Sequence, residues 1–200
     1  DIFLLRGVLT EEECDALMAS VEETTPAETV TPGDVTSRKR CQVAWLHNTW
    51  TKTLARSLGN LFLSTTVKTH PGTGVEDLQI LDYAPGGEFV LHHDGEGRLL
   101  TILYYLNGLG ETWFPLAGEH ISRPRTKDEA LSMVQRDHGL VVGGEHVSIN
   151  RGDAVAFYNY LDNGDFHWNS IHAGLPVQGE SHKWVANHWF RYGGFSSPDR

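Results

Sequence analysis

Cysteine is scarce in this chain, and long apolar runs are missing. The 200 residues include two cysteines, Cys14 and Cys41, too few for the disulfide framework of a small secreted domain. No apolar run approaches the roughly 20 residues that a membrane-crossing helix requires. The composition excludes a disulfide-stapled scaffold and predicts no membrane contact within this segment.

Basic residues are also few. Lys and Arg total 16 against 26 Asp and Glu, which gives a formal net charge of −10. The one dense basic run is Arg38-Lys39-Arg40. A nucleic-acid groove needs clustered cations that displace counterions from phosphates, so nucleic acid is excluded as a partner.

The chain begins at Asp1 without Met or a signal-like segment. We interpret it as a fragment from which any targeting segment is absent, and its compartment and oligomeric state stay unknown. A chain of this length buries a full core without staples, and we expect a single domain over 1–200.

Two helices are predicted in the first third of the chain. The segment Thr10-Glu11-Glu12-Glu13 has the pattern of a capping box, and apolar residues then recur at helical spacing, which predicts a helix over 11–23 with Cys14 as a buried thiol. Residues 24–40 show no period and contain Pro and Gly, so we expect a long surface loop, either dispensable or a lid. A second apolar stripe predicts a helix packed on the core; it consists of Trp50, Leu54, Leu58, Leu61 and Phe62.

After Pro71-Gly72 the pattern changes to short apolar or alternating runs between turn residues. Eight short strands, with 21 glycines for the turns, favour a double-sheet jelly roll over an α/β layer structure. The predicted fold is mainly β with flanking helices (α+β), a cupin-like double-stranded β-helix with N-terminal helices packed on one sheet. The predicted strands lie near 77–83, 88–94, 99–106, 111–114, 146–150, 154–158, 168–172 and 183–190.

Within the single domain we expect a helical N-terminal support over 1–70 and a jelly-roll core over 76–192. An insertion at about 116–145 interrupts the core. It includes Thr126-Lys127-Asp128-Glu129, which predicts a capped short helix that Gly139 closes. This insertion is a second candidate lid over the barrel mouth.

The pattern His92-His93-Asp94, with a distant His172, predicts a metal site. In a strand, residues i and i+2 point the same way, so His92 and Asp94 can hold one ion while His93 faces the opposite side. Two His and one carboxylate on one face, with other positions left open, are the usual ligands of non-haem Fe(II). With 11 His in the chain, roughly 0.7 H-x-D triplets arise by chance, so the context has to decide.

That context consists of six blocks in sequence order. The first runs from Tyr83 to Asp94 with the pattern Y-x-x-G-G-x-x-x-x-H-x-D; the others are RLLTILYYLN (98–107), GETWFP (110–115), RGDA (151–154), HAGLPV (172–177) and KWVANHWF (183–190). Together they resemble the prolyl 4-hydroxylase family of Fe(II)/2-oxoglutarate dioxygenases. The match covers about 77–115 and 147–191, and more loosely the segment Leu9 to Cys14, whereas 24–40 and 116–145 are unmatched.

The resemblance implies a dioxygenase that couples the decarboxylation of 2-oxoglutarate to succinate with hydroxylation of a C–H bond. It implies that His92, Asp94 and His172 hold Fe(II). Dioxygen is then the oxidant, and ascorbate supports the reaction.

The far carboxylate of 2-oxoglutarate needs a fixed cation, because the keto-acid end of the molecule chelates the iron. Lys183 is the candidate. His172 and Lys183 flank a turn around 179–182, so we expect them on two adjacent antiparallel strands.

Other residues are expected around the same cosubstrate. Because Val185, Asn187 and Trp189 share the strand face of Lys183, Trp189 is a predicted pocket wall. The resemblance implies that Thr101 and Tyr105, which share one face of their strand, hydrogen-bond the cosubstrate and that Tyr83 lines its pocket.

The substrate is left open between two classes. The resemblance favours a prolyl residue in a peptide or protein. The alternative is a free amino acid or small natural product, because the connector Gly95-Glu96-Gly97 is shorter than in many family members that bind peptidyl proline. A zinc hydrolase with the same three ligands would not need Lys183, and a non-catalytic jelly-roll binding module would have no reason to keep the ligands and the anchor together.

Overall fold

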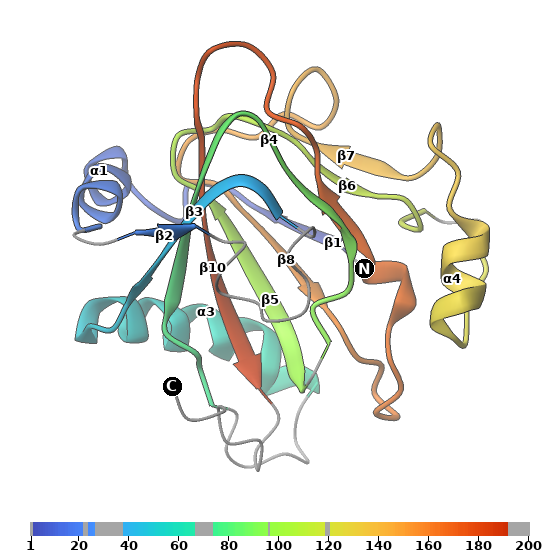
Figure 1. The fold of residues 1–200 in the computed structure, drawn as a ribbon. Helices are drawn as coiled ribbons and strands as arrows, with labels where there is room; N and C mark the ends of the chain where they lie inside the picture. Colours follow the sequence, from blue (N-terminus) through green and yellow to red (C-terminus); the bar gives the residue numbers. More distant parts are fainter. Residues whose placement is uncertain are drawn as a thin grey trace.

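The computed structural model describes residues 2–21, 24–26, 38–66, 74–95, 97–118 and 121–191. Figure 1 shows a bent β-sheet with α1 and α3 on one side and α4 at the opposite edge. In chain order the elements are β1 (Ile2–Leu5), α1 (Glu11–Ala19), β2 (Thr25–Pro26), β3 (Arg38–Leu46), α3 (Thr49–Thr66), β4 (Leu78–His92), β5 (Arg98–Tyr105), β6 (Thr112–Phe114), α4 (Lys127–Met133), β7 (Leu140–Val142), β8 (Ala154–Tyr158), the 3-10 helix η1 (Trp168–Ser170), β9 (His172–Gly174) and β10 (Lys183–Arg191).

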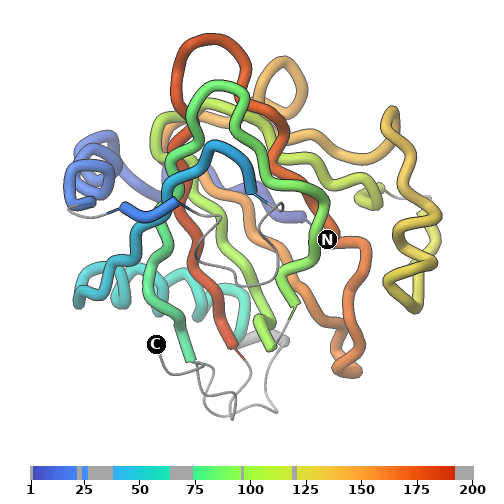
Figure 2. The backbone as a smooth tube through the Cα atoms, viewed as in Figure 1, coloured from blue at the N-terminus to red at the C-terminus, as the bar shows by residue number. Residues whose placement is uncertain are grey.

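The described strands form one sheet in the order β1-β8-β5-β10-β4-β9-β6-β7, and β3 pairs with both β4 and β2. Strand β4 belongs to two halves of this sheet. Its residues Gln79–Tyr83 pair with β10, whereas Phe89 and His92 pair with β9. Figure 2 shows β4 rising along one side, turning at the end of the barrel and descending on the other. The sheet therefore bends around an interior as a mainly antiparallel half-barrel.

A bulge in β4 makes this bend. Between the pairs Cys41–Tyr83 and Lys39–Glu88 the strand has extra residues opposite Arg40. Gly87 fits there because a Cβ would lie 2.8 Å from the Arg40 carbonyl oxygen, and Gly86 has φ +74°, a conformation open mainly to glycine. The Gly86 N–H donates to Val177 O at 2.9 Å, and the Val177 N–H donates to Gly87 O at 3.0 Å. The bend is thus fixed by the chain just after β9.

Apolar side chains pack on both faces of the larger half of the sheet. On its outer face, Cys14 and Leu17 of α1 and Ala55 and Phe62 of α3 pack against the strands, as predicted for N-terminal helices on one sheet. A Cβ on Gly59 would lie 2.5 Å from the buried ring of Phe190, which brings α3 close to β10. The barrel interior holds a second cluster, which includes Leu81, Leu103, Tyr105, Phe114, Phe157 and Val185.

The predicted helices are found, with corrections. Helix α1 has the predicted capping box, in which Thr10 Oγ1 accepts from the Glu13 N–H and Glu13 accepts from the Thr10 N–H, but it ends at Ala19. In α3, Trp50 is 40% exposed and Leu61 66% exposed, so the prediction that both pack on the core was wrong. The predicted Phe62 is buried, and Leu54 and Leu58 are partly buried against the core. The fully buried positions of α3 include Thr51 and Ala55, small residues that allow the helix to lie close to the sheet.

Several strand predictions were also wrong. Segments 77–83 and 88–94 form the single strand β4, since the glycine bulge bends the strand without ending it. Residues 146–150 form only one isolated bridge, from Val147 to Val142. Most of 168–172 is the 3-10 helix η1 followed by the first residue of β9.

The N-terminal support contains strands as well as helices. Strand β1 pairs with β8, and β3 pairs along β4. Thus 25–26 and 38–40 of the predicted loop lie in strands, while 27–37 of that loop lie outside the described residues. Among the described helices, none has the length and apolarity needed to cross a membrane.

The predicted insertion has structure of its own. Thr126 caps α4 as expected, but the helix ends at Met133, short of Gly139. Gly139 instead lies against Pro115 with φ +94°, where a Cβ would collide with backbone atoms. Strand β7 then pairs with β6, so the insertion widens the smaller half of the sheet.

Candidate metal and cosubstrate site

Three predicted ligands meet where β4 ends and β9 begins. His92 and His172 are direct partners across the two strands, and Asp94 follows two residues after His92. One ligand atom from each of the three side chains lies within 4.8 Å of the others. The Asp94 carboxylate lies 3.5 Å from His92 Nε2 and 4.0 Å from His172 Nε2. This spacing leaves room for one ion between the three donors.

Both imidazoles are oriented by the backbone two residues before them. His92 Nδ1 lies 2.8 Å from Val90 O, and His172 Nδ1 lies 2.9 Å from Ser170 O. A carbonyl oxygen only accepts, so Nδ1 carries the hydrogen in each ring and Nε2 keeps a lone pair on the side of Asp94. Burial lowers the pKa of His172 to about 3, which keeps this ring neutral at pH 7, the form in which His binds a metal.

The Asp94 carboxylate is buried, and two side chains donate to it. The Thr101 hydroxyl lies 2.6 Å and the Trp189 indole N–H 3.1 Å from Oδ2. Burial raises the pKa of Asp94, but the neighbouring His172 and His92 outweigh burial and hold it well below its usual value. The group is thus a carboxylate with one oxygen, Oδ1, free of these donors.

Lys183 is a buried cation in the same cavity. It is 2% exposed, and its Nζ donates to Glu111 O at 2.8 Å. Burial lowers its pKa to about 8. No carboxylate in the described part of the chain forms an ion pair with it. A buried ammonium without a counter-ion is costly, which makes this position suited to an anionic ligand.

The other predicted residues divide between the two ends of the cavity. Strand register places Thr101 opposite Trp189, at the Asp94 end, and Tyr105 opposite Val185, near Lys183. The Lys183 ammonium lies 5.6 Å from the centroid of the Tyr105 ring and 5.9 Å from that of Tyr83. The cavity is lined by His92, Asp94 and His172 together with Leu81, Tyr83, Phe89, Leu103, Thr112, Gly174, Lys183, Val185, Asn187 and Trp189.

The hydroxyls of Thr101 and Tyr105, both expected to hydrogen-bond the cosubstrate, have partners within the protein. The Thr101 hydroxyl donates to Asp94 and accepts from Asn159 Nδ2 at 2.9 Å, so it orients the carboxylate. The Tyr105 hydroxyl lies 2.6 Å from Thr112 Oγ1. His172 and Lys183 are not on adjacent strands, because β4 lies between β9 and β10.

Sequence reasoning missed several residues around the site. Phe89 stacks on the His92 ring with centroids 3.6 Å apart. Gly110 has φ +81°, and a Cβ there would collide with the aliphatic stem of Lys183. A glycine inside the matched block 110–115 was the available signal for this contact. Asn159 and Ser170, both fully buried, had no such signal.

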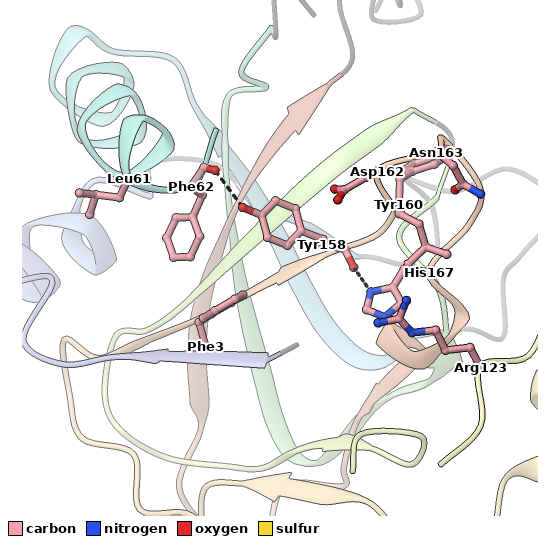
Figure 3. Close-up of a pocket in the computed structure, with 10 residues that line it drawn as sticks. Phe3, Leu61, Phe62, Arg123, Tyr158, Tyr160, Asp162, Asn163 and His167 are labelled. Carbon is pink, nitrogen blue, oxygen red and sulfur yellow. Dashed lines mark hydrogen bonds between the residues drawn. The ribbon is translucent and has the colours of Figure 1, made fainter. Parts of the chain in front are cut away.

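His93 faces away from the predicted ligands, as alternation along the strand implies. Its ring packs against Phe166 and Trp168, with centroids 5.4 and 5.0 Å away. A separate surface cavity of about 670 Å³, drawn in Figure 3, is bordered by Phe3, Leu61 and Tyr158. The described residues that line it include none of the predicted site residues.

Comparison with known proteins assigns the chain to a protein superfamily. The model of the 2OG-Fe(II) oxygenase superfamily matches residues 78–191, which include every predicted site residue. The chain belongs to this superfamily. The dioxygenase resembles a putative prolyl 4-hydroxylase of Acanthamoeba polyphaga mimivirus, with 26% identity over 97% of this chain and 75% of the relative. It also resembles the probable prolyl 4-hydroxylase 6 of Arabidopsis thaliana, with 29% identity over 96% of this chain and 69% of the relative.

Solved structures share the fold of this dioxygenase. The viral collagen prolyl hydroxylase of Paramecium Bursaria Chlorella virus-1, in complex with 2OG, superposes with a TM-score of 0.66 at 20% identity over 96% of both chains. A prolyl hydroxylase of Trichoplax adhaerens, in complex with a peptide fragment of the hypoxia-inducible factor oxygen degradation domain, gives a TM-score of 0.58 at 15% identity over 96% of this chain and 83% of the other. The predicted jelly-roll fold is confirmed.

The chain is therefore a 2-oxoglutarate-dependent dioxygenase of the prolyl 4-hydroxylase family. Its residues fit Fe(II) and 2-oxoglutarate. Two imidazole nitrogens and a carboxylate converge, as Fe(II) requires, and the buried Lys183 offers a cation to a carboxylate at the other end of the same cavity.

Proposed function

We propose that this dioxygenase hydroxylates a prolyl residue within a peptide or protein. The proposal is supported by relatives described as prolyl 4-hydroxylases that align over 96–97% of this chain. One observation carries the catalytic part of the proposal: the His92, Asp94 and His172 cluster and the buried Lys183 line one cavity.

In this proposal His92 and His172 hold Fe(II) through Nε2, and Asp94 holds it through Oδ1. Thr101 and Trp189 donate to Asp94 Oδ2 and thereby hold the carboxylate in one orientation. Removing such a partner of a metal ligand typically weakens metal affinity by roughly 10- to 100-fold. Iron with bound 2-oxoglutarate supplies the oxidising chemistry, and the protein positions both and holds the target C–H bond close.

Lys183 binds the far carboxylate of 2-oxoglutarate in this proposal. The Glu111 carbonyl fixes the ammonium, and the rings of Tyr83 and Tyr105 form the walls around it. These walls exclude water, which strengthens a charge-assisted hydrogen bond. Dependence on ascorbate stays a prediction from the family resemblance.

The nature of the substrate is testable by product formation. The short connector 95–97 keeps a free amino acid or small natural product as the second candidate. Purified enzyme with Fe(II) and 2-oxoglutarate is incubated with proline-rich peptides or with a panel of free amino acids, and succinate is measured. We expect peptides to stimulate succinate formation and to gain one oxygen atom on proline by mass spectrometry. Stimulation by free amino acids alone would overturn the peptide assignment.

A further inference from the structure

Asn159 is a fully buried amide between the two strand ends that carry the site. It follows β8 directly and is 0% exposed. Its backbone is fixed on both sides, since its N–H donates to Leu99 O at 2.8 Å and its carbonyl accepts from the His167 N–H at 2.9 Å. His167, seen in Figure 3, donates in turn from its ring to Tyr158 O at 3.2 Å. The amide therefore stands at a defined place rather than on a mobile loop.

One end of the Asn159 amide acts on Asp94 through Thr101. The Nδ2 group donates to Thr101 Oγ1 at 2.9 Å, and Thr101 Oγ1 lies 2.6 Å from Asp94 Oδ2. A hydroxyl has a single proton. Because the amide supplies a hydrogen to the Thr101 oxygen, the proton of Thr101 is directed to Asp94. Without the amide, the hydroxyl could rotate away from the carboxylate.

The other end of the amide contacts the segment that orients His172. Asn159 Oδ1 lies 3.4 Å from Ser170 Oγ, but the single proton of Ser170 goes to the closer His167 O at 2.8 Å, so this end of the amide packs against Ser170 without fixing it. The carbonyl of the same Ser170 accepts from His172 Nδ1 at 2.9 Å. Ser170 is 0% and Thr101 1% exposed, so water does not compete for these contacts.

We propose that Asn159 is a positioning residue for the metal site, because its buried amide directs the Thr101 proton to the carboxylate of Asp94. This inference rests on the proposed assignment of Asp94 as an Fe(II) ligand. Asn159 does not contact Asp94 directly and acts through Thr101. Hydrogen-bonded partners behind metal ligands typically change metal affinity by roughly 10- to 100-fold when removed.

The test measures Co(II) binding to the full, chelator-treated chain through the visible absorption of bound Co(II). We expect Asn159→Leu, which keeps the number and branching of side-chain heavy atoms but has no hydrogen-bonding group, to weaken Co(II) binding by about 10- to 100-fold and to change the absorption spectrum. Asn169→Leu is the matched control. It removes a neighbouring amide that bonds to Leu116 O and should leave both affinity and spectrum unchanged.

A double-mutant cycle separates positioning from general loss of packing. If Asn159 acts through Thr101, then Asn159→Leu combined with Thr101→Val should lose much less affinity than the product of the two single losses. Thr101→Ser, which keeps the hydroxyl, should restore most of the affinity lost in Thr101→Val. If the affinity loss of the double variant equals the product of the two single losses, the inference is overturned. It is also overturned if Asn159→Leu binds Co(II) within twofold of wild type.

Thermal unfolding of each metal-free variant shows whether the fold is kept. Where Asn159→Leu does not fold, Asn159→Asp takes its place, because it keeps the shape but removes the N–H that directs the Thr101 proton. An Asp variant that binds Co(II) as wild type does would contradict the inference. If wild type itself binds no Co(II), the metal assignment fails with it; if wild type binds and the variants are unchanged, only the role of Asn159 fails.

Discussion

The ammonium of Lys183 lies 2.8 Å from the carbonyl oxygen of Glu111 and has no carboxylate partner in the described ranges. One neutral acceptor fixes this cation without neutralising it. Lys183 therefore keeps its charge available for a ligand, while its side chain is held in one position before the ligand arrives.

Removing this cation should weaken cosubstrate binding. A charge-assisted hydrogen bond contributes about 1.5–3 kcal/mol, so we expect Lys183→Ala to raise the 2-oxoglutarate concentration for half-maximal turnover by at least about tenfold. Lys127→Ala, at the start of the exposed helix α4, is the control. The measurement is succinate formation as a function of 2-oxoglutarate, and an unchanged requirement would mean that another cation binds the carboxylate.

Gly110 should control the position of the same cation. Gly110→Ala places a methyl group against the stem of Lys183, so we expect weaker 2-oxoglutarate binding together with unchanged Co(II) affinity. Gly164→Ala is a matched control because Gly164 has a similar φ of +87° but no atom within 4 Å of its Cβ position. Equal effects of the two substitutions on 2-oxoglutarate binding would point to backbone strain rather than to contact with Lys183.

Cosubstrate binding should weaken in alkaline solution. Burial lowers the pKa of Lys183 to about 8, so the free enzyme loses the ammonium as pH rises through about 8. We expect the dissociation constant of 2-oxoglutarate, measured anaerobically with Fe(II) by its charge-transfer absorption, to rise from pH 7.5 to 9. The Lys183→Arg variant keeps its charge in this range, and a rise of the same size in that variant would assign the effect to another group.

Acid should destabilise the metal-free protein partly through His188, which is remote from the ligands. Its ring contacts the Tyr104 hydroxyl at 3.0 Å, and burial lowers its pKa to about 4. The unfolded chain binds a proton near pH 6.5 whereas the folded chain resists it, so stability is full above pH 6.5 and falls as pH decreases toward 4.

The lowering of the His188 pKa from 6.5 to about 4 corresponds to a loss of about 3 kcal/mol in the free energy of unfolding once the ring is fully protonated. Urea unfolding at pH 7 and pH 4.5 measures it, and His188→Phe should lose less stability between the two pH values than wild type does. If both proteins lose the same free energy of unfolding, His188 does not carry the acid sensitivity.

Part of the metal cluster and the helix caps were predictable from local rules. Alternation along a strand places His92 and Asp94 on one side and His93 on the other, and the caps at Thr10 and Thr126 depend on neighbours three residues away. The third ligand, His172, lies about eighty residues further along the chain and was predicted through the family resemblance; the cluster of all three is found.

Relations between distant segments were not predictable in the same way. Strand β3 begins in the basic run Arg38-Lys39-Arg40, which looks like a solvated turn, but Arg38 lies 4.1 Å over the Phe89 ring. The role of Thr101 depended on which end of the cavity it reaches, and only its pairing with Trp189 decides that. Asn159 has no periodic signal, since its contacts come from segments 58 and 11 residues away.

The bent strand β4 has one more consequence. It carries Tyr83, beside the cationic end of the cavity, and His92, at the metal end, on one continuous stretch of chain. Lys183 of β10 pairs directly with Tyr83, so the register of β10 on β4, together with the stretch of β4 from Tyr83 to His92, sets how far the ammonium lies from the metal ligands. A one-residue slip between these two strands would move the cation relative to the ligands and would also turn its side chain to the other face of the sheet.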